Sequence, residues 1–232
     1  MTTIAERLAH LSVAHLCDAC LRVGIHIRIA PPLAPIVPGQ RASGRVRPVR
    51  HAGSVDVFLE ALERSSAGEV LVVDNDDRDD EGCLGDLTAL EVSNAGLSGI
   101  VIWGRHRDTA ILRAISLPLF SKGACGRGPV RLDARDAETF RSARIGGEVA
   151  TPDDWAIADD DGVLFVADAH IAAVAEAGEA IRDAEARQVA LMGEGVPLRA
   201  QLRFDDYVLA READPGLDFR AHLRGLNAAI EE

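Results

Sequence analysis

The chain has 232 residues, a formal net charge of −12, 47% hydrophobic residues and 27% charged residues. This composition is ordinary for a globular protein, and the acidic balance is unsuited to binding DNA or RNA by phosphate neutralisation. No apolar run approaches the roughly 20 residues that span a bilayer, and the first residues lack the basic start and apolar core of a signal peptide. We therefore expect a cytoplasmic protein that binds neither nucleic acid nor membrane.

Hydrophobic periodicity and turn residues predict a series of elements in chain order. They are helix 12–23, an extended proline-rich connector 30–40, strand 42–50, a helix capped by Ser54, strand 70–74, an acidic loop 75–82, helix 86–95, strand 99–103, helix 108–115, strand 118–120, a glycine-rich loop 122–128, a β-rich unit 141–166, helix 168–192 and a helical tail 193–232. Alternation of strands and helices predicts one α/β domain over 1–192, followed by a C-terminal helical extension over 193–232.

Two patterns resemble metal sites only superficially. Cys17 and Cys20 form a CxxC, but it lies mid-helix without a second CxxC, so buried small side chains are favoured over zinc or redox chemistry. The acidic loop 75–82 fails the calcium-loop spacing because Arg78 stands where an oxygen ligand is required. We expect this loop to be solvated.

The segment 85–108 carries the strongest chemical signal. If strands 70–74 and 99–103 are adjacent, the turn at Gly85 and the charged pair Arg107-Asp108 share one cleft, because ligands of α/β sheets bind outside the carboxyl ends of strands. The first amides of the helix starting after Gly85 attract carboxylates. Arg107 can hold a carboxylate by two hydrogen bonds, and Asp108 offers hard oxygen to a divalent cation.

These groups together would bind a small 2-oxo acid. Arg107 and a metal ion would polarise its keto oxygen and stabilise an enolate while a carbon–carbon bond breaks. The alternative interpretation of the same residues is structural: Arg107 and Asp108 form a salt-bridged helix start. The spacing alone favours this alternative.

The motif G-[DE]-L-x(8)-G-x-x-G-x-V-x-x-G-x-x-R-D resembles that of the RraA-like family, which includes class II 4-hydroxy-4-methyl-2-oxoglutarate aldolases and regulators of ribonuclease activity. It is met here by Gly85, Asp86, Leu87, Gly96, Gly99, Val101, Gly104, Arg107 and Asp108. The stretches LSVAHLCDAC, AGEVLVVD and IGGEVATPDDWAIADDDGVLFV also resemble family segments. The resemblance covers roughly residues 11–190.

The resemblance implies a swivelling β/β/α-type fold and homotrimers, or dimers of trimers, with sites at subunit interfaces. It implies that Arg107 binds substrate, that Asp108 binds Mg²⁺ or Mn²⁺, and that the turn Gly85–Thr88, including Leu87, cradles the pyruvyl carboxylate. Asp86 would act in proton transfer or through a water molecule on the metal ion. Glu185 would reach the site of a neighbouring subunit.

Two positions depart from the family pattern. Trp103 stands where the family usually has aspartate, and its indole is expected to narrow the cleft. His106 stands where an apolar residue is usual; a surface or helix-start position is favoured over an acid/base role. The tail 193–232 goes beyond the minimal aldolase, and either wraps a neighbouring subunit or is a solvated addition.

The leading hypothesis is a divalent-metal-dependent lyase that cleaves a 4-hydroxy-2-oxo acid or decarboxylates oxaloacetate. No Schiff base is expected, because Lys122, the sole lysine, lies outside the motif. The alternative is a non-catalytic ring that binds a ribonuclease or another protein, for which the acidic charge is suited. A methyltransferase is disfavoured, since no glycine-rich nucleoside-binding turn lies near the chain start.

Overall fold

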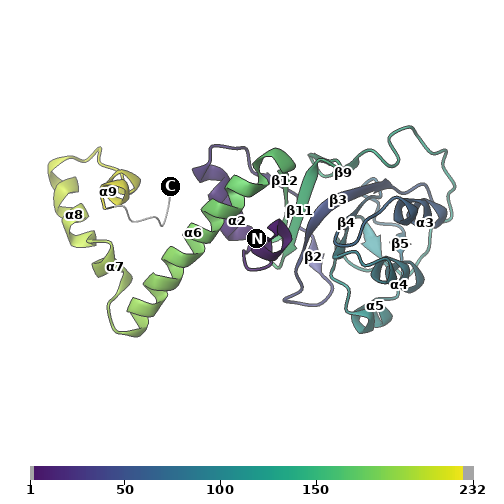
Figure 1. Ribbon diagram of the computed structural model, residues 1–232, viewed down its shortest axis with the longest axis horizontal. Coiled ribbons are helices and arrows are strands. Elements are labelled where there is room, and N and C mark those ends of the chain that lie inside the picture. Colours follow the sequence, from purple (N-terminus) through teal and green to yellow (C-terminus); the bar gives the residue numbers. More distant parts are fainter. Residues whose placement is uncertain (1–2, 227–232) are drawn as a thin grey trace. The chain divides into compact units, whose positions relative to one another are not determined.

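The structure is a computed structural model that describes residues 3–226 (Figure 1). Its helices are α1 (Ile4–Leu8), α2 (Val13–Arg22), α3 (Asp56–Glu63), α4 (Asp86–Asn94), α5 (Thr109–Ile115), α6 (Asp168–Gly193), α7 (Leu198–Gln201), α8 (Phe204–Ala213) and α9 (Phe219–Gly225). Its strands are β1 (Arg28–Ile29), β2 (Ala34–Pro35), β3 (Ala42–Arg50), β4 (Val70–Asp74), β5 (Gly82–Leu84), β6 (Gly99–Trp103), β7 (Arg105–His106), β8 (Leu119–Ser121), β9 (Ala143–Ile145), β10 (Glu148–Ala150), β11 (Asp154–Asp159) and β12 (Gly162–Ala167).

An eight-stranded sheet forms the centre of the first compact unit, which contains Ile27–Ala172 and the chain up to Val13. The strand order is β1-β12-β11-β3-β4-β6-β8-β2. Strands β3, β4, β6 and β8 run parallel, and the outer pairs are antiparallel. Residues 30–33 alone link β1 to β2 at opposite ends of this order, so the sheet curls into a half-barrel. The predicted α/β class is confirmed.

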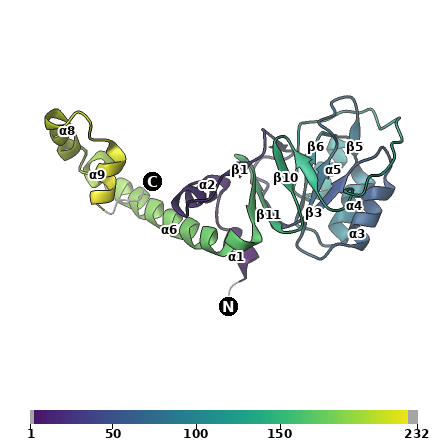
Figure 2. The same ribbon diagram turned by 90° about the horizontal axis from the view of Figure 1, so that it is seen from above.

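Both faces of the central strands are buried. Along β4, Leu71 and Val73 face a core cluster with the helices α3, α4 and α5, which lie together on that side of the sheet (Figures 1 and 2). Val70 and Val72 face a second cluster on the other side, which includes residues of the β9–β10 hairpin. Side chains alternate along a strand, so burial on both faces explains the unbroken apolar run of β4.

The structure corrects the prediction in two respects. The N-cap of α3 is Val55, with no side-chain cap bond, so Ser54 is not the helix cap. Helix α1 and the two- or three-residue strands β1, β2, β5 and β7 were not predicted, and β2 lies inside the expected proline-rich connector. Segments this short carry too few residues to display a period.

The second compact unit contains Ala14–His26 and the chain from Ala173. Its helices α8 and α9 share an aromatic cluster, in which the rings of Tyr207 and Phe219 lie 4.9 Å apart. The predicted helical tail is confirmed over its described part. The boundary at residue 192 and the packing of the tail on a neighbouring subunit stay predictions. Over residues 3–226, the protein has no helix whose length and apolar character would let it cross a membrane.

Candidate active site

Two segments far apart in sequence build the candidate site. Strands 70–74 and 99–103 pair in parallel, so the condition for a shared cleft, that these two strands be adjacent, is met. Beyond them, β5 and β7 also pair in parallel, and the Arg107 amide donates a hydrogen bond to the Leu84 carbonyl over 2.9 Å. The chain after β5 turns at Gly85 into α4. This pairing holds the start of α4 beside the end of β7.

The side chains of Arg107 and Asp108 converge over Gly85. A Cβ atom built on Gly85 would overlap Asp108 Oδ2 and stand 3.0 Å from Arg107 Nε. Arg107 Nε is 3.4 Å from Asp108 Oδ2, so the ion pair of the structural alternative is present. However, Asp108 has φ 60° and makes no side-chain cap bond to α5. A left-handed non-glycine residue is uncommon, and such strain is concentrated at functional sites.

Two further glycines shape the surface on which Arg107 lies. A Cβ atom on Gly128 would stand 2.6 Å from Arg107 Nη1, and one on Gly82 would stand 2.9 Å from Arg107 Cβ. The Gly82 amide donates to the Arg127 carbonyl over 2.7 Å, which fixes this part of the loop against β5. The sequence analysis missed both glycines; the glycine-rich loop 122–128 was the available signal.

A cavity of about 190 Å³, here called the Arg107 cavity, lies beside this surface. Its lining consists of His51, Gly53, Ser54, Val55, Gly82, Cys83, Gly85, Thr88, Arg107 and Pro129. The side chains of Arg107 and Asp108 are 46% and 36% exposed, so a ligand entering from solvent can reach both. The small volume suits a ligand of a few carbon atoms.

The predicted cradle occupies the first turn of α4, whose amides have no partner within the helix. One of them is already taken, because the Leu87 amide donates to Asp86 Oδ1 over 2.7 Å. Thr88 is buried and lines the Arg107 cavity, whereas the Leu87 side chain is 77% exposed. The structure thus brings Gly85 and Thr88 together with Arg107, and leaves the side chain of Leu87 in solvent.

Glu185 lies on α6 in the second unit. Its carboxylate pairs with His15, with 3.0 Å between Oε2 and Nε2. That Glu185 reaches the site of a neighbouring subunit stays a prediction.

Asp108 is the residue that could hold a divalent metal ion at this site. Within residues 3–226, no group of three or more His, Cys, Asp or Glu side chains is arranged to enclose a metal ion. Mg²⁺ needs no such cage, because it keeps several waters and binds through one or two carboxylates and substrate oxygens. The exposed carboxylate of Asp108 therefore fits Mg²⁺ or Mn²⁺ completed by water and substrate.

Trp103 lies away from the Arg107 cavity. Its ring packs against the core cluster on the other face of the sheet, and Lys122 Nζ lies 5.3 Å from the ring centroid. Trp103 does not contribute to the cavity lining. This placement contradicts the expectation that the indole narrows the cleft.

His106 is buried, so the predicted surface position is wrong. Its Nδ1 lies 2.7 Å from Ser121 Oγ, and its Nε2 lies 2.9 Å from Thr109 Oγ1. Burial, with a smaller contribution from Arg113, lowers the pKa of the imidazole. His106 lines a different cavity from Arg107.

Ion pairs connect most of the acidic loop 75–82 to the rest of the protein. Lys122 Nζ contacts Asp77 Oδ1 at 2.5 Å and Asp79 Oδ1 at 3.1 Å. The hydrogen bond to Asp77 is the main cause of a raised pKa for Lys122, which keeps this amine protonated. Glu81 is buried and accepts from Arg131 Nη2 over 3.0 Å. The expectation of a solvated loop is therefore wrong for Glu81.

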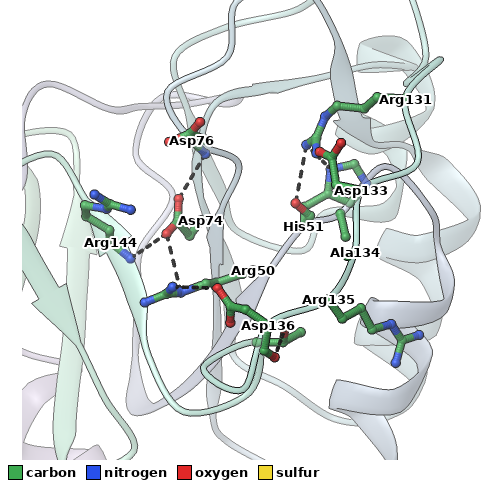
Figure 3. A pocket seen from close by; sticks show the side chains of 12 residues that line it. Arg50, His51, Asp74, Asp76, Arg131, Asp133, Ala134, Arg135, Asp136 and Arg144 are labelled. Atoms are coloured by element: carbon green, nitrogen blue, oxygen red, sulfur yellow. Dashed lines mark hydrogen bonds and ion pairs between the residues drawn. The ribbon is translucent and has the colours of Figure 1, made fainter.

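A further cavity of about 270 Å³ contains a charged network (Figure 3). Arg50 Nη1 donates to Asp136 Oδ2 over 3.1 Å. The Asp74 carboxylate accepts from the amides of Asp76 at 2.9 Å and Arg144 at 3.1 Å. The network joins β3, β4 and β9. The hydrogen bonds of Arg50 and Asp74 are made within the protein, so we assign this network a structural role.

His51 belongs to a buried polar cluster between this network and the Arg107 cavity. Its Nδ1 lies 2.8 Å from Asn75 Oδ1, and Arg131 Nη2 donates to the same Asn75 oxygen over 3.0 Å. Burial is the main cause of a lowered pKa for His51. The imidazole is therefore neutral in the folded protein near pH 7, while the same histidine in the unfolded chain protonates near its ordinary pKa of 6.5.

This difference in pKa between the folded and unfolded chain predicts a pH-dependent stability. Below pH 6.5 the unfolded chain binds a proton at His51, whereas the folded chain does not. The free energy of unfolding should therefore decrease as the pH is lowered, by up to about 1.4 kcal/mol per pH unit. Denaturant unfolding between about pH 5 and pH 8, the range in which histidines titrate, measures the slope. His51→Gln should flatten it, and the exposed-site control His10→Gln should not. An unchanged slope in His51→Gln contradicts the prediction.

The curled eight-stranded sheet and the site at the start of α4 define an α/β protein with a half-barrel sheet. A family model described as RraA-like, Aldolase/RraA, matches residues 13–165. The chain therefore belongs to the RraA-like family. This family includes aldolases and RraA-type ribonuclease inhibitors, so membership alone does not decide between the two hypotheses.

Several solved structures are similar to this chain in fold. An uncharacterized protein from Pseudomonas syringae pv. tomato str. DC3000 is similar with a TM-score of 0.74 and 26% identity, over 84% of this chain and 94% of that chain. Streptomyces coelicolor RraAS2, described as an unusual member of the RNase ES inhibitor RraA family, is similar in fold, with a TM-score of 0.70 and 24% identity over 82% of this chain and 96% of its own. The RNA-processing inhibitor RraA from Thermus thermophilis has a TM-score of 0.56 and 25% identity, over 64% and 90% respectively.

Proposed function

We propose that this protein is a divalent-metal-dependent lyase that forms pyruvate through its enolate. The substrate is either a 4-hydroxy-2-oxo acid, cleaved by retro-aldol reaction, or oxaloacetate, which is decarboxylated. The observation that carries the proposal is the convergence of Arg107 and Asp108 over Gly85, on the edge of a cavity of about 190 Å³.

Arg107 has the central part in the proposed reaction. The absence of a side chain at Gly82 and Gly128 leaves room for Arg107, whose side chain is 46% exposed, so its guanidinium can donate two parallel hydrogen bonds to the carboxylate and keto oxygens of a 2-oxo acid. When the bond between C3 and C4 breaks, its electron pair moves toward C2 and places negative charge on the keto oxygen. A fixed cation at that oxygen stabilises the enolate more than the substrate.

Asp108 would hold Mg²⁺ or Mn²⁺, which would supply Lewis acidity to the reaction. The amides of the Gly85–Thr88 turn, other than the Leu87 amide that donates to Asp86, would orient the substrate carboxylate. Asp86 would take the proton of the 4-hydroxyl group, directly or through a water molecule, and C3 of the enolate is then protonated to give pyruvate. Glu185 of a neighbouring subunit would complete the site in a homotrimer or a dimer of trimers.

Release of pyruvate tests the proposal. We expect metal-dependent pyruvate from oxaloacetate or from 4-hydroxy-4-methyl-2-oxoglutarate, above a blank that contains metal alone, and its loss after EDTA. Asp108→Ala should remove the metal-dependent rate while the protein stays folded. No pyruvate from the folded, metal-supplied oligomer with either substrate would show that the proposal is wrong.

A second candidate function is a regulator that binds a ribonuclease. The similarity to the Thermus RNA-processing inhibitor favours it, and the net charge of −12 suits docking to a basic protein surface. A pull-down with a ribonuclease of the RNA-degradation machinery at several salt concentrations distinguishes the two functions. Binding that is weakened by salt and unaffected by Arg107→Ala, without pyruvate release, would support the regulator.

A further inference from the structure

A cavity of about 250 Å³, here called the His106 cavity, lies on the other side of β7 from Arg107. Its lining consists of Ala34, Pro35, Ile36, His106, Thr109, Arg113, Ser121, Lys122, Gly123 and Ala124. It shares no residue with the lining of the Arg107 cavity. The proposed lyase reaction leaves this cavity without a role.

The buried hydrogen bonds of His106 determine which protons face this cavity. The Gly123 amide donates to Ser121 Oγ over 3.1 Å, so the Ser121 hydroxyl is free to donate its own hydrogen to His106 Nδ1 at 2.7 Å. The other ring nitrogen of the neutral imidazole then carries a hydrogen and donates to Thr109 Oγ1 at 2.9 Å. This arrangement gives the buried Ser121 hydroxyl an acceptor, and it leaves the Thr109 hydroxyl with a hydrogen to donate.

Arg113 adds a cation that the protein does not neutralise. Its Nε donates to the Ile36 carbonyl over 3.2 Å, and in the described part of the chain no carboxylate lies within ion-pair distance of it. Its charge acts on His106, whose pKa it lowers in addition to burial. Lys122, by contrast, is committed to Asp77 and Asp79. The His106 cavity therefore presents one available guanidinium group.

The remaining wall is apolar. Ala34, Pro35, Ile36 and Ala124 contribute it, and a hydrocarbon chain is favourable against such a surface. A single available cation, a hydroxyl donor and an apolar wall together match an anionic head with one negative charge and a short apolar tail. A second carboxylate on the ligand would find no partner here.

We propose that the His106 cavity is a binding site for small monocarboxylates, in which Arg113 and Thr109 hold the carboxylate and the apolar wall holds a short hydrocarbon tail. Inorganic phosphate has no tail and gains only the polar half of these contacts. The site is separate from the Arg107 cavity, so the inference stands whether or not the protein is a lyase.

Calorimetric titration with butyrate tests the inference. The titration uses the Arg107→Ala protein, so that the proposed substrate site does not bind butyrate as well. In this protein we expect one butyrate site per chain. Adding Arg113→Gln should weaken binding by about tenfold or more, because a charged hydrogen-bond partner is lost. Arg64→Gln, an exposed arginine paired with Glu60, is the matched control and should change nothing.

A second pair of variants tests the Thr109 hydroxyl, which contacts both His106 Nε2 and the proposed ligand. Thr109→Ser keeps the hydroxyl and should keep the affinity, whereas Thr109→Val keeps the shape and should weaken butyrate binding. No butyrate binding to the folded Arg107→Ala protein would overturn the inference, as would equal binding after Arg113→Gln. Inorganic phosphate that binds as tightly as butyrate would overturn the assignment to monocarboxylates.

Discussion

Arg107→Ala should lower kcat/KM for pyruvate formation by about 10²- to 10³-fold, the usual effect of removing one preorganised donor at a developing oxyanion. The guanidinium contributes to both substrate binding and enolate stabilisation, so we expect KM to rise and kcat to fall together. Steady-state kinetics with saturating Mg²⁺ or Mn²⁺ measures both. Arg107→Lys should recover only part of the loss, because an ammonium group cannot form two parallel hydrogen bonds.

Arg105 provides the control, since it lies two residues earlier on β7. Its Nε donates to Asp79 Oδ1 over 2.9 Å, and it does not line the Arg107 cavity. Arg105→Ala removes the same charge two residues earlier in the chain and should leave kcat/KM close to that of the unmodified protein. Full turnover by a folded Arg107→Ala protein would exclude Arg107 from the reaction and favour the regulator.

The longer elements were predictable because each one carries its own signal. Strand β4 is a run of buried residues bounded by a glycine turn and an acidic loop, and α6 has 26 residues of helix-forming sequence. The short strands β5 and β7 have no such signal. Their pairing is a tertiary property, because it depends on the chain bringing residues 82–84 and 105–106 together.

The site was predictable to the extent that its parts are adjacent in sequence. Arg107 and Asp108 are neighbours, and the motif relates them to Gly85. The contacts of Gly82 and Gly128 with Arg107 are not visible in the sequence, since they join three separate segments. The burial of His106 was not predictable in the same way, because it depends on the two-residue strand β7, which carries no periodic signal of its own.

The backbone conformation of Asp108 bears on whether its ion pair with Arg107 is only structural or belongs to a ligand-binding site. The usual residue at a helix start has extended backbone angles and accepts a hydrogen bond from the helix with its side chain. Asp108 instead has φ 60° and ψ 35° and makes no cap bond. Its carboxylate is thus held over Gly85 at a cost in backbone strain, which a metal-binding role would explain.

Gly85→Ala should be the most informative single substitution. The backbone of Gly85, with φ −129° and ψ −163°, is extended and accepts alanine. The added methyl group, however, would overlap Asp108 Oδ2 and stand 3.0 Å from Arg107 Nε. Both are side-chain atoms that can move, so the protein should fold with the side chains of Asp108 and Arg107 displaced. A displacement of roughly 1 Å costs about 10²-fold in rate, and kcat/KM should fall by at least that factor.

Gly126→Ala is the matched control, because a Cβ atom there meets no heavy atom within 4 Å and the residue lies in the same glycine-rich loop as Gly128. It should retain full pyruvate release. Thermal unfolding of both variants separates misplacement from instability, since loss of a glycine N-cap costs only about 1 kcal/mol. A Gly85→Ala protein that releases pyruvate at the normal rate would show that Arg107 and Asp108 need not meet over Gly85. A variant that is inactive but still binds a ribonuclease would show that this chain has both activities on separate surfaces.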